Sequence, residues 1–253
     1  MRRDRLVEYL ESRLSISSFS DYSFNGVQIA GAEEVSRVGF SVDSGSAIFR
    51  DAVELELDFL VVHHGLFWNG ANPSLRGPMK ERISLLLSHN ITLFAAHLPL
   101  DVHAEIGNNA VLLEQVGCDG SSQGMVPCGT GYLGNLGVVS EPRTVQEISN
   151  DLLRHYPGVD MKVVLPDRLV QRVAVLSGAA SRKDFYRACA MGADLFITGE
   201  QCDYFHDACD AGCGLLFMGH HASEEGGMRA LRRDVERVFP QLNTHCINHA
   251  TGL

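Results

Sequence analysis

In Phe59-Leu60-Val61-Val62-His63-His64, four apolar residues run directly into two histidines. Short apolar runs bounded by turn residues are typical of buried strands. Residues 91–96 form a similar run that ends at His97, and residues 215–219 form another that ends at His220. Side chains at the carboxyl ends of parallel strands gather at one edge of an open α/β sheet, where ligands usually bind. The sequence therefore predicts an α/β fold with a ligand site at that edge.

Strand and helix patterns alternate along the rest of the chain. Strands are expected at residues 37–43, 58–64, 91–97, 132–139, 161–165, 172–178, 194–200 and 214–220. Helices are expected at residues 46–57, 79–89, 108–116, 144–155, 183–191 and 224–238. This alternation predicts an α/β fold with mixed, largely parallel sheets.

The two halves of the chain have similar patterns. A strand, a helix and a second strand follow one another at residues 37–62 and again at residues 172–198. We interpret the similarity as an internal duplication that produces two related α/β lobes. The Gly-rich stretch at 117–131 is the expected boundary, so the lobes would comprise residues 1–127 and 128–253.

The composition narrows the possible classes of protein. Of the 253 residues, 45% are hydrophobic, which is enough for a substantial core. The formal charge of -10 argues against a nucleic-acid surface. No apolar run approaches the roughly 20 residues that span a bilayer, and the first 14 residues form an amphipathic helical pattern that is unlike a signal peptide. We therefore expect a cytoplasmic protein. The seven cysteines include no C-x-x-C pair, which argues against a disulfide framework.

Five side chains can supply a metal site with two cations between the lobes. Such a site needs neutral imidazoles together with carboxylates that bridge the ions. A carboxylate follows two of the histidines at the fourth position, in one case Asp101 and in the other Glu224. A single histidine at a strand end would be explained as a polar residue that ends a buried strand, but three such clusters together favour metal. The candidate ligands are His63, His64, Asp101, His220 and Glu224.

His97 and Glu200 are the candidate catalytic residues. The duplication makes His97 the counterpart of His220, so it is either a sixth ligand or a residue that orients Asp101 or binds a bridging water, and we favour the latter. Glu200 stands where His64 stands in the first half. It is a candidate base or a partner of a ligand, with a solvated carboxylate at a strand end as the alternative.

Two further places are candidates for substrate binding. Gly107, Asn108 and Asn109 open a helix shortly after Asp101, so their backbone amides could bind a phosphate, although an ordinary helix cap explains the same residues. His221 is adjacent to a proposed ligand and is either a substrate contact or a surface residue.

Six motifs stand out in chain order. They are Asn25-Gly26-Val27-Gln28, His63-His64-Gly65-Leu66-Phe67-Trp68, His97-Leu98-Pro99-Leu100-Asp101, Gly107-Asn108-Asn109, Ile197-Thr198-Gly199-Glu200 and Gly219-His220-His221-Ala222-Ser223-Glu224. Together they resemble the motifs of the Nif-three-like family, whose bacterial members are known as type 2 homologues of GTP cyclohydrolase I. The resemblance spans nearly the whole chain. One departure is Leu98-Pro99, where many members have Thr-Asn, and it concerns local substrate contacts.

The resemblance implies a ring-shaped homo-oligomer, typically a hexamer, with two divalent ions per chain. Zinc, iron and manganese all accept imidazole and carboxylate ligands. It implies that the five candidate ligands bind these ions, with Glu224 as a bridge. It also implies a hydrolase that converts GTP to dihydroneopterin triphosphate and formate. Two alternatives stay open, namely hydrolysis of phosphoesters or amides at the same centre, and a non-enzymatic metal-binding scaffold or regulator. A small, nucleotide-like molecule is the expected partner, with neither nucleic acid nor membrane.

Overall fold

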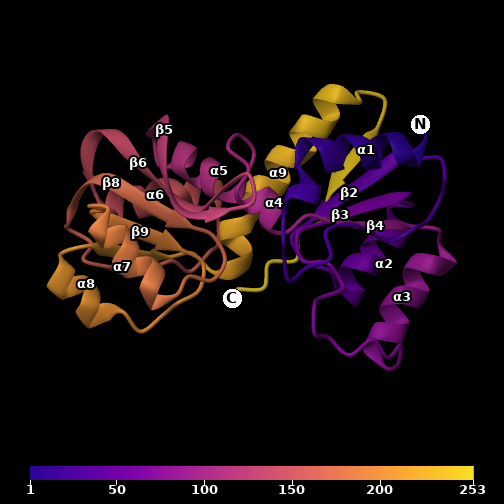
Figure 1. The fold of residues 1–253 in the computed structure, drawn as a ribbon, viewed down its shortest axis with the longest axis horizontal. Coiled ribbons are helices and arrows are strands. Elements are labelled where there is room, and N and C mark those ends of the chain that lie inside the picture. The colour runs from indigo at the N-terminus through magenta and orange to yellow at the C-terminus, as the bar shows by residue number, and fades with distance from the viewer. Residues whose placement is uncertain (253) are drawn as a thin grey trace. The chain divides into compact units, whose positions relative to one another are not determined.

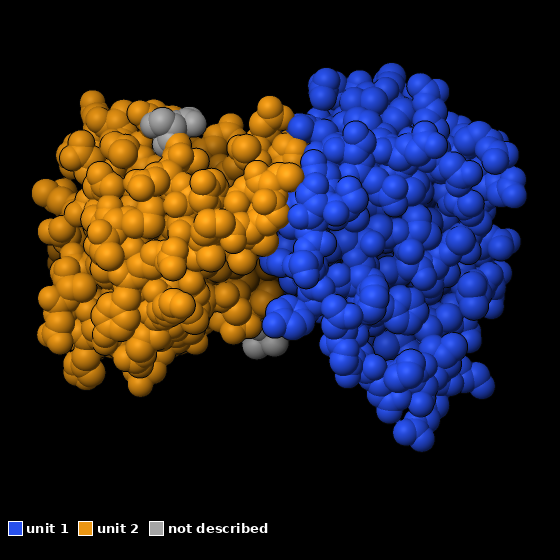
Figure 2. Space-filling view, in the orientation of Figure 1, with its two compact units in different colours: residues 1–100, 228–249 blue, residues 101–227, 250–253 orange. Residues whose placement is uncertain are grey.

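The computed structural model describes residues 1–252, without the side chains of residues 120 and 121, and forms two compact units (Figure 1 and Figure 2). Unit 1, blue in Figure 2, comprises residues 1–100 and 228–249. Unit 2, orange in Figure 2, comprises residues 101–227 and the end of the chain from residue 250. Each unit contains one β-sheet with helices against it, so the predicted mixed α/β fold is confirmed.

The sheet of unit 1 has five strands in the order β1-β4-β3-β2-β11. Strands β2, β3, β4 and β11 pair in parallel, and β1 runs antiparallel to β4. The histidines follow directly, since β3 ends one residue before His63 and β4 ends two residues before His97. The strands are β1 (Gly26–Ile29), β2 (Arg37–Ser41), β3 (Phe59–Val62), β4 (Thr92–Ala95) and β11 (Asn243–Cys246).

Helices cover both faces of this sheet (Figure 1). On one face, alternate strand residues such as Leu60 and Val62 pack with Phe49 of α2 and Leu86 of α3 in one core. On the other face lie α1 and the last part of α9, where Tyr9 packs edge-to-face against Phe239 at 5.1 Å. The helices are α1 (Arg3–Arg13), the 3₁₀ turn η1 (Ile16–Ser18), α2 (Ser46–Glu54), α3 (Pro78–Ser88), the short α4 (Leu98–Asp101) and α9 (His220–Val238).

The sheet of unit 2 has six strands in the order β5-β6-β8-β9-β10-β7. Only β8, β9 and β10 pair in parallel. Strand β6 runs antiparallel to β8, β5 to β6, and β7 to β10, so this sheet is less parallel than the sequence pattern predicted. The strands are β5 (Cys118–Cys128), β6 (Gly131–Thr144), β7 (Lys162–Val164), β8 (Leu169–Leu176), β9 (Leu195–Thr198) and β10 (Gly214–Phe217).

The helices of unit 2 also divide between the two faces. Residues of α5 and α6 share a core with Val173 and Val175, whereas residues of α7 and α8 share a second core with Ala174 and Phe196. Helix α6 begins at a capping box, in which the hydroxyl of Thr144 accepts from the backbone of Glu147. The helices are α5 (Asn108–Gln115), α6 (Val145–His155), α7 (Arg182–Ala190), α8 (Phe205–Ala211) and the first part of α9.

The Gly-rich stretch at 117–131 is a strand and a turn rather than a linker. It forms β5 and the tight connection to β6, where Cys128 pairs with Gly131. Gly124 stands in the strand because a Cβ there would lie about 2 Å from the ring of Tyr132 on β6. The compact units divide after residues 100, 227 and 249, and residue 127 lies inside unit 2. The proposed division of the chain into duplicated halves stays a prediction.

The two sheets have a common topology that agrees with the idea of a duplication. In unit 1, β2, β3 and β4 are parallel neighbours and β1 is antiparallel at the edge beside β4. In unit 2, β8, β9 and β10 repeat this pattern with β7 antiparallel beside β10. Each antiparallel edge strand precedes its three parallel strands in the sequence.

Three further expectations from the sequence can be compared with the structure. All seven cysteines are free thiols. Among residues 1–252, no helix has both the length and the apolar character that crossing a bilayer requires. The amphipathic N-terminal helix is confirmed as α1, with Leu6 and Leu10 fully buried.

Candidate functional site

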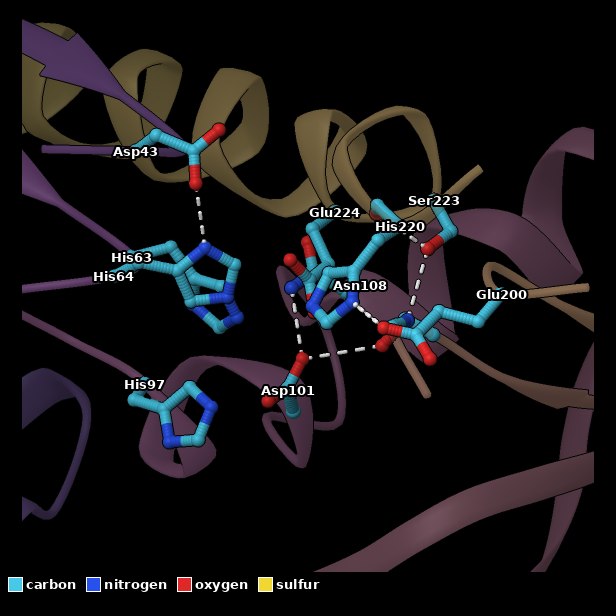
Figure 3. Close-up of polar contacts among 12 residues, drawn as sticks. Asp43, His63, His64, His97, Asp101, Asn108, Glu200, His220, Ser223 and Glu224 are labelled. Atoms are coloured by element: carbon cyan, nitrogen blue, oxygen red, sulfur yellow. Dashed lines mark hydrogen bonds and ion pairs between the residues drawn. The ribbon is translucent and has the colours of Figure 1, made fainter. Parts of the chain in front are cut away.

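Three histidines of unit 1 form a cluster beyond the ends of β3 and β4. A ring nitrogen of each lies within 4.8 Å of a ring nitrogen of the other two. The ring centroid of His63 is 4.7 Å from that of His64 and 5.1 Å from that of His97. Because β3 has already ended at Val62, His63 and His64 need not point to opposite faces, and both rings belong to the cluster (Figure 3).

Each of these imidazoles has an oxygen acceptor at Nδ1. The carbonyl of Ala96 lies 2.8 Å from Nδ1 of His63. The carboxylate of Asp43 lies 2.8 Å from Nδ1 of His64, as Figure 3 shows. A histidine that donates Nδ1–H to an acceptor carries its lone pair on Nε2, which is the arrangement found in metal-binding histidines. The three imidazoles therefore fit a divalent cation in both their spacing and their tautomers.

The acceptor for His97 is Asp21, a residue that the sequence analysis did not single out. Its oxygens lie 2.9 and 3.1 Å from Nδ1 of His97, and its side chain is only 2% exposed. The same carboxylate accepts from the side-chain amide of Asn25 and from the backbone N–H of Leu98. Burial favours a higher pKa for Asp21, but the hydrogen bonds from His97 and Asn25 outweigh it and lower the pKa to about 2. Asp21 is therefore a carboxylate that fixes His97.

The Asn25-Gly26-Val27-Gln28 motif holds the histidine segments in place. The side-chain carbonyl of Asn25 accepts from the backbone N–H of His97 at 2.7 Å. The side-chain carbonyl of Gln28 accepts from the backbone N–H of Leu66 at 2.7 Å. Gly65 leaves room for this side chain, because a Cβ at position 65 would lie 2.3 Å from the amide nitrogen of Gln28 and would displace it. The motif thus positions the backbone on both sides of the cluster.

Trp68 is the single tryptophan of the chain and borders the histidine cluster. Its ring centroid is 5.0 Å from that of His97, in an edge-on arrangement, and 6.1 Å from that of His64. Its indole N–H donates to the carbonyl of Gly65 at 2.8 Å. The indole is therefore held against two of the three imidazoles.

Asp101 of unit 2 is a buried carboxylate that is fixed by several donors. Its side-chain oxygen accepts from the amide of Asn108 at 2.8 Å and from the hydroxyl of Ser177 at 3.1 Å (Figure 3). The amide of Asn109 donates to its backbone carbonyl. A carboxylate oxygen of Asp101 lies within 4.8 Å of one of Glu224, so the two carboxylates of unit 2 have the spacing of a pair that could share a cation.

Asn108 and Asn109 are buried and make these contacts with their side chains. The side-chain carbonyl of Asn108 accepts from the backbone N–H of Gly227, and that of Asn109 accepts from the backbone N–H of Ser177. Their amides therefore position Asp101 and the neighbouring backbone. Contact of residues 107–109 with a substrate phosphate stays a prediction.

His220 and Glu224 lie one turn apart at the start of α9, which begins four residues earlier than the sequence pattern indicated. This turn brings Nε2 of His220 to 3.3 Å from Oε1 of Glu224. Nδ1 of His220 lies 2.8 Å from Oε1 of Glu200, which follows β9 (Figure 3). Glu200 thus contacts a candidate ligand directly, while about half of its side chain is exposed. The donor types of His220 and Glu224 fit a divalent cation.

Close packing of the backbone holds this turn. The hydroxyl of Ser223 accepts from the backbone N–H of Gly178 at 2.8 Å and donates to the carbonyl of His220 at 2.8 Å. Gly178 has a φ of +66°, and a Cβ there would lie 2.5 Å from Oε1 of Glu224 and 3.2 Å from Nε2 of His220.

His221, the predicted substrate contact, is 5% exposed and has Nε2 3.8 Å from Oε1 of Glu225.

Comparison with known proteins places the chain among relatives that match its full length. The model of the Duf34/NIF3 (NGG1p interacting factor 3) family matches residues 1–251. A protein of Archaeoglobus fulgidus named "GTP cyclohydrolase 1 type 2 homolog" is 36% identical over 252 residues, which cover 97% of this chain and 100% of that protein.

Two solved structures resemble the chain over its full length. One, described as "protein ybgI, unknown function", is 32% identical and superposes with a TM-score of 0.90. The other, TTHA1606 from Thermus thermophilus, is 37% identical with a TM-score of 0.86. In both cases the match covers 100% of each chain.

We expect Asp21→Ala to lower the free energy of unfolding by about 3 kcal/mol, because it leaves His97, Asn25 and the Leu98 amide without a buried acceptor. The pKa of Asp21 is lowered from 3.8 to about 2 by folding, so its contribution is complete above pH 3.8 and is lost as the pH falls toward 2. Urea unfolding at several pH values measures this difference. The control is Asp210→Ala on the exposed side of α8, and an equal effect of the two substitutions would contradict the assignment.

We expect Gly178→Ala to weaken the binding of divalent cations, because the new Cβ displaces Glu224 and His220. The positive φ also strains alanine, at a cost of about 1–2 kcal/mol in unfolding free energy. Gly158→Ala is the matched control, since Gly158 has a φ of +86° and no atom within 4 Å of its Cβ position. Both variants should lose stability in urea titrations, and only Gly178→Ala should lose cation affinity by calorimetry. Equal cation affinity in the two variants would rule out this role for Gly178.

Proposed function

The chain belongs to the Duf34/NIF3 family, and on that premise we propose that it is a metal-dependent hydrolase of a purine nucleotide. The observation that carries the proposal is the cluster of His63, His64 and His97, in which every Nδ1 has an oxygen acceptor. Imidazoles held in this tautomer present the lone pair of Nε2, which we assign to cation binding in His63 and His64 and to proton transfer in His97. A polar residue that merely ends a strand would need no such arrangement at three positions.

We propose two divalent ions per chain, with His63, His64, Asp101, His220 and Glu224 as ligands and zinc, iron or manganese as the metals. Imidazole and carboxylate donors accept all three metals. The proximity of two carboxylates that are 6% and 3% exposed, Asp101 and Glu224, supports the proposal for unit 2, because a cation between them offsets the cost of burying two like charges together. When bound, divalent cations supply Lewis-acid chemistry that lowers the pKa of water and stabilises developing negative charge.

The proposed reaction converts GTP to dihydroneopterin triphosphate and formate. Water adds at C8 of the guanine and the five-membered ring opens to a formamide. A second water hydrolyses this formamide and releases C8 as formate, and the ribose then rearranges and condenses with loss of one water to close the new ring. Proton transfers accompany these steps, and we assign them to His97 and Glu200. Asp21 supports this role of His97, since a carboxylate at Nδ1 stabilises the imidazolium that forms when Nε2 accepts a proton.

Glu200 is suited to exchange protons with the substrate or with solvent. Its side chain is 51% exposed, and one oxygen is engaged by Nδ1 of His220. A carboxylate with one oxygen fixed keeps a defined orientation while the other oxygen can take up a proton. We further propose that His221 and residues 107–109 contact the substrate, as the sequence analysis predicts.

We also propose that the chain acts as a ring-shaped homo-oligomer of six subunits, as the sequence resemblance implies. A non-enzymatic scaffold held together by metal would have the same assembly. The two functions differ in what metal removal does, since a scaffold would lose its assembly and have no turnover to lose.

Metal binding is testable through the fluorescence of Trp68. We expect divalent cations added to chelator-treated protein to change the emission of Trp68, because its ring packs against those of His64 and His97. Elemental analysis of freshly purified protein should give two metal ions per chain. His64→Ala should abolish the fluorescence change, whereas His89→Ala at the exposed end of α3 should keep it. An unchanged response in His64→Ala would contradict metal binding by the cluster.

The reaction is testable with purified, metal-restored protein. We expect GTP to yield formate and a pterin that fluoresces after oxidation, and Glu224→Gln to abolish both products. Generic phosphoesters and cyclic amides are tested in parallel. Hydrolysis of those compounds, with no reaction of GTP, would contradict the cyclohydrolase proposal and favour a phosphoesterase or amidohydrolase. No turnover of any substrate with zinc, iron or manganese restored, together with loss of the oligomer on chelation, would favour the scaffold.

A further inference from the structure

Unit 2 contains a cavity of about 450 Å³ that is lined by His220 and Glu200. Its other lining residues include Asp160, Lys162, Gly199 and Phe217. The cavity thus adjoins a candidate ligand and a candidate proton-transfer residue, and its volume is large enough for a heterocyclic ring.

The topology of the sheet explains why Asp160 and Lys162 reach this cavity. Strand β7 runs antiparallel to β10, and its first residue, Lys162, pairs with Phe217, the last residue of β10. The antiparallel strand therefore begins at the edge where the parallel strands end, which is where ligands bind in open α/β sheets. Asp160 lies two residues before Lys162 and reaches the same edge.

The floor of the cavity is buried. Phe217 is 4% exposed, and Gly199 is buried beside it. A side chain at Gly199 is excluded, because its Cβ would lie 2.5 Å from the carbonyl of Gly178 and 2.6 Å from the hydroxyl of Ser223. The side chain of Phe217 shares a core with residues of α7 and α8, and the bare backbone at Gly199 lets a planar ring approach the floor closely.

Asp160 and Lys162 place an acceptor group and a donor group in contact on the exposed side of the cavity. The side chains of Asp160 and Lys162 are 83% and 51% exposed, and Nζ of Lys162 lies 2.5 Å from Oδ2 of Asp160. A carboxylate can accept from two adjacent N–H groups, and an ammonium donates to a carbonyl oxygen. The pair therefore complements a ring edge that presents two neighbouring donors followed by an acceptor.

We propose that this cavity binds the heterocycle of the substrate and that Asp160 and Lys162 recognise the edge of guanine. The carboxylate of Asp160 accepts from N1–H and from the 2-amino group, and Lys162 donates to O6. The inference rests on the proposed function and adds to it the residues that determine base specificity. Adenine is disfavoured because its N1 acceptor faces the carboxylate and its 6-amino donor faces the ammonium.

Calorimetric binding of GTP, inosine triphosphate and ATP to the complete protein tests this site without requiring turnover. We expect GTP to bind on the order of 10-fold more tightly than inosine triphosphate, which lacks the 2-amino group, and ATP to bind most weakly. Asp160→Asn should reduce GTP affinity on the order of 10-fold or more and remove most of the preference over inosine triphosphate. Lys162→Met should weaken GTP and inosine triphosphate equally, since both carry O6.

Asp210→Asn on α8 and Lys183→Met on α7 are the matched controls, because both residues are exposed and outside the cavity. The proposal is overturned if Asp160→Asn keeps the base preference of Asp210→Asn, if GTP and inosine triphosphate bind equally, or if none of the three nucleotides binds. Turnover of GTP with an unchanged preference in Asp160→Asn would sink this inference and leave the hydrolase standing. The expected binding pattern without any turnover would support base recognition by Asp160 and Lys162 and contradict the proposed hydrolase.

Discussion

Hydrogen bonds at Nδ1 of the histidines are the interactions on which the rest of the site depends. An imidazole can bind a cation only through a nitrogen that carries a lone pair, and a fixed acceptor on the other nitrogen determines which one that is. In unit 1 these acceptors are a backbone carbonyl and two carboxylates, and in unit 2 the acceptor is Glu200. The acceptors also fix the ring planes, so the geometry of the imidazoles is set by protein contacts.

The backbone near the ligands has little freedom, which explains several small residues. Gly65 leaves room for Gln28, and Gly178 leaves room for Glu224. The hydroxyl of Ser223 joins the start of α9 to the loop after β8 through two hydrogen bonds. These contacts convert a flexible stretch of chain into a rigid support, and rigid supports are what metal and catalytic sites require.

The two units use one strand topology for different chemistry. The residue two positions after the second parallel strand is His64 in unit 1 and Glu200 in unit 2. The segment before the antiparallel edge strand contributes Asp21 in unit 1 and Asp160 in unit 2. In unit 1 that acid is buried and orients a histidine, whereas in unit 2 it is exposed beside a cavity. The same strand topology thus carries a cluster of imidazoles in unit 1 and polar groups that line a cavity in unit 2.

The sequence by itself determined the parallel strands and the histidines at their ends, because buried strands and their termini leave a local pattern of apolar and polar residues. It also indicated the carboxylates four residues after His97 and His220. Only the tertiary structure revealed Asp21 and Asp43, since they meet their histidines across 76 and 21 residues of sequence, a separation at which no local pattern exists. It likewise showed that residues 118–128 form a strand. The glycine at 124, which suggests a linker in the sequence alone, makes room for a tyrosine on the neighbouring strand. Local periodicity decides which elements form, and contacts between distant segments decide how the side chains at their ends are oriented.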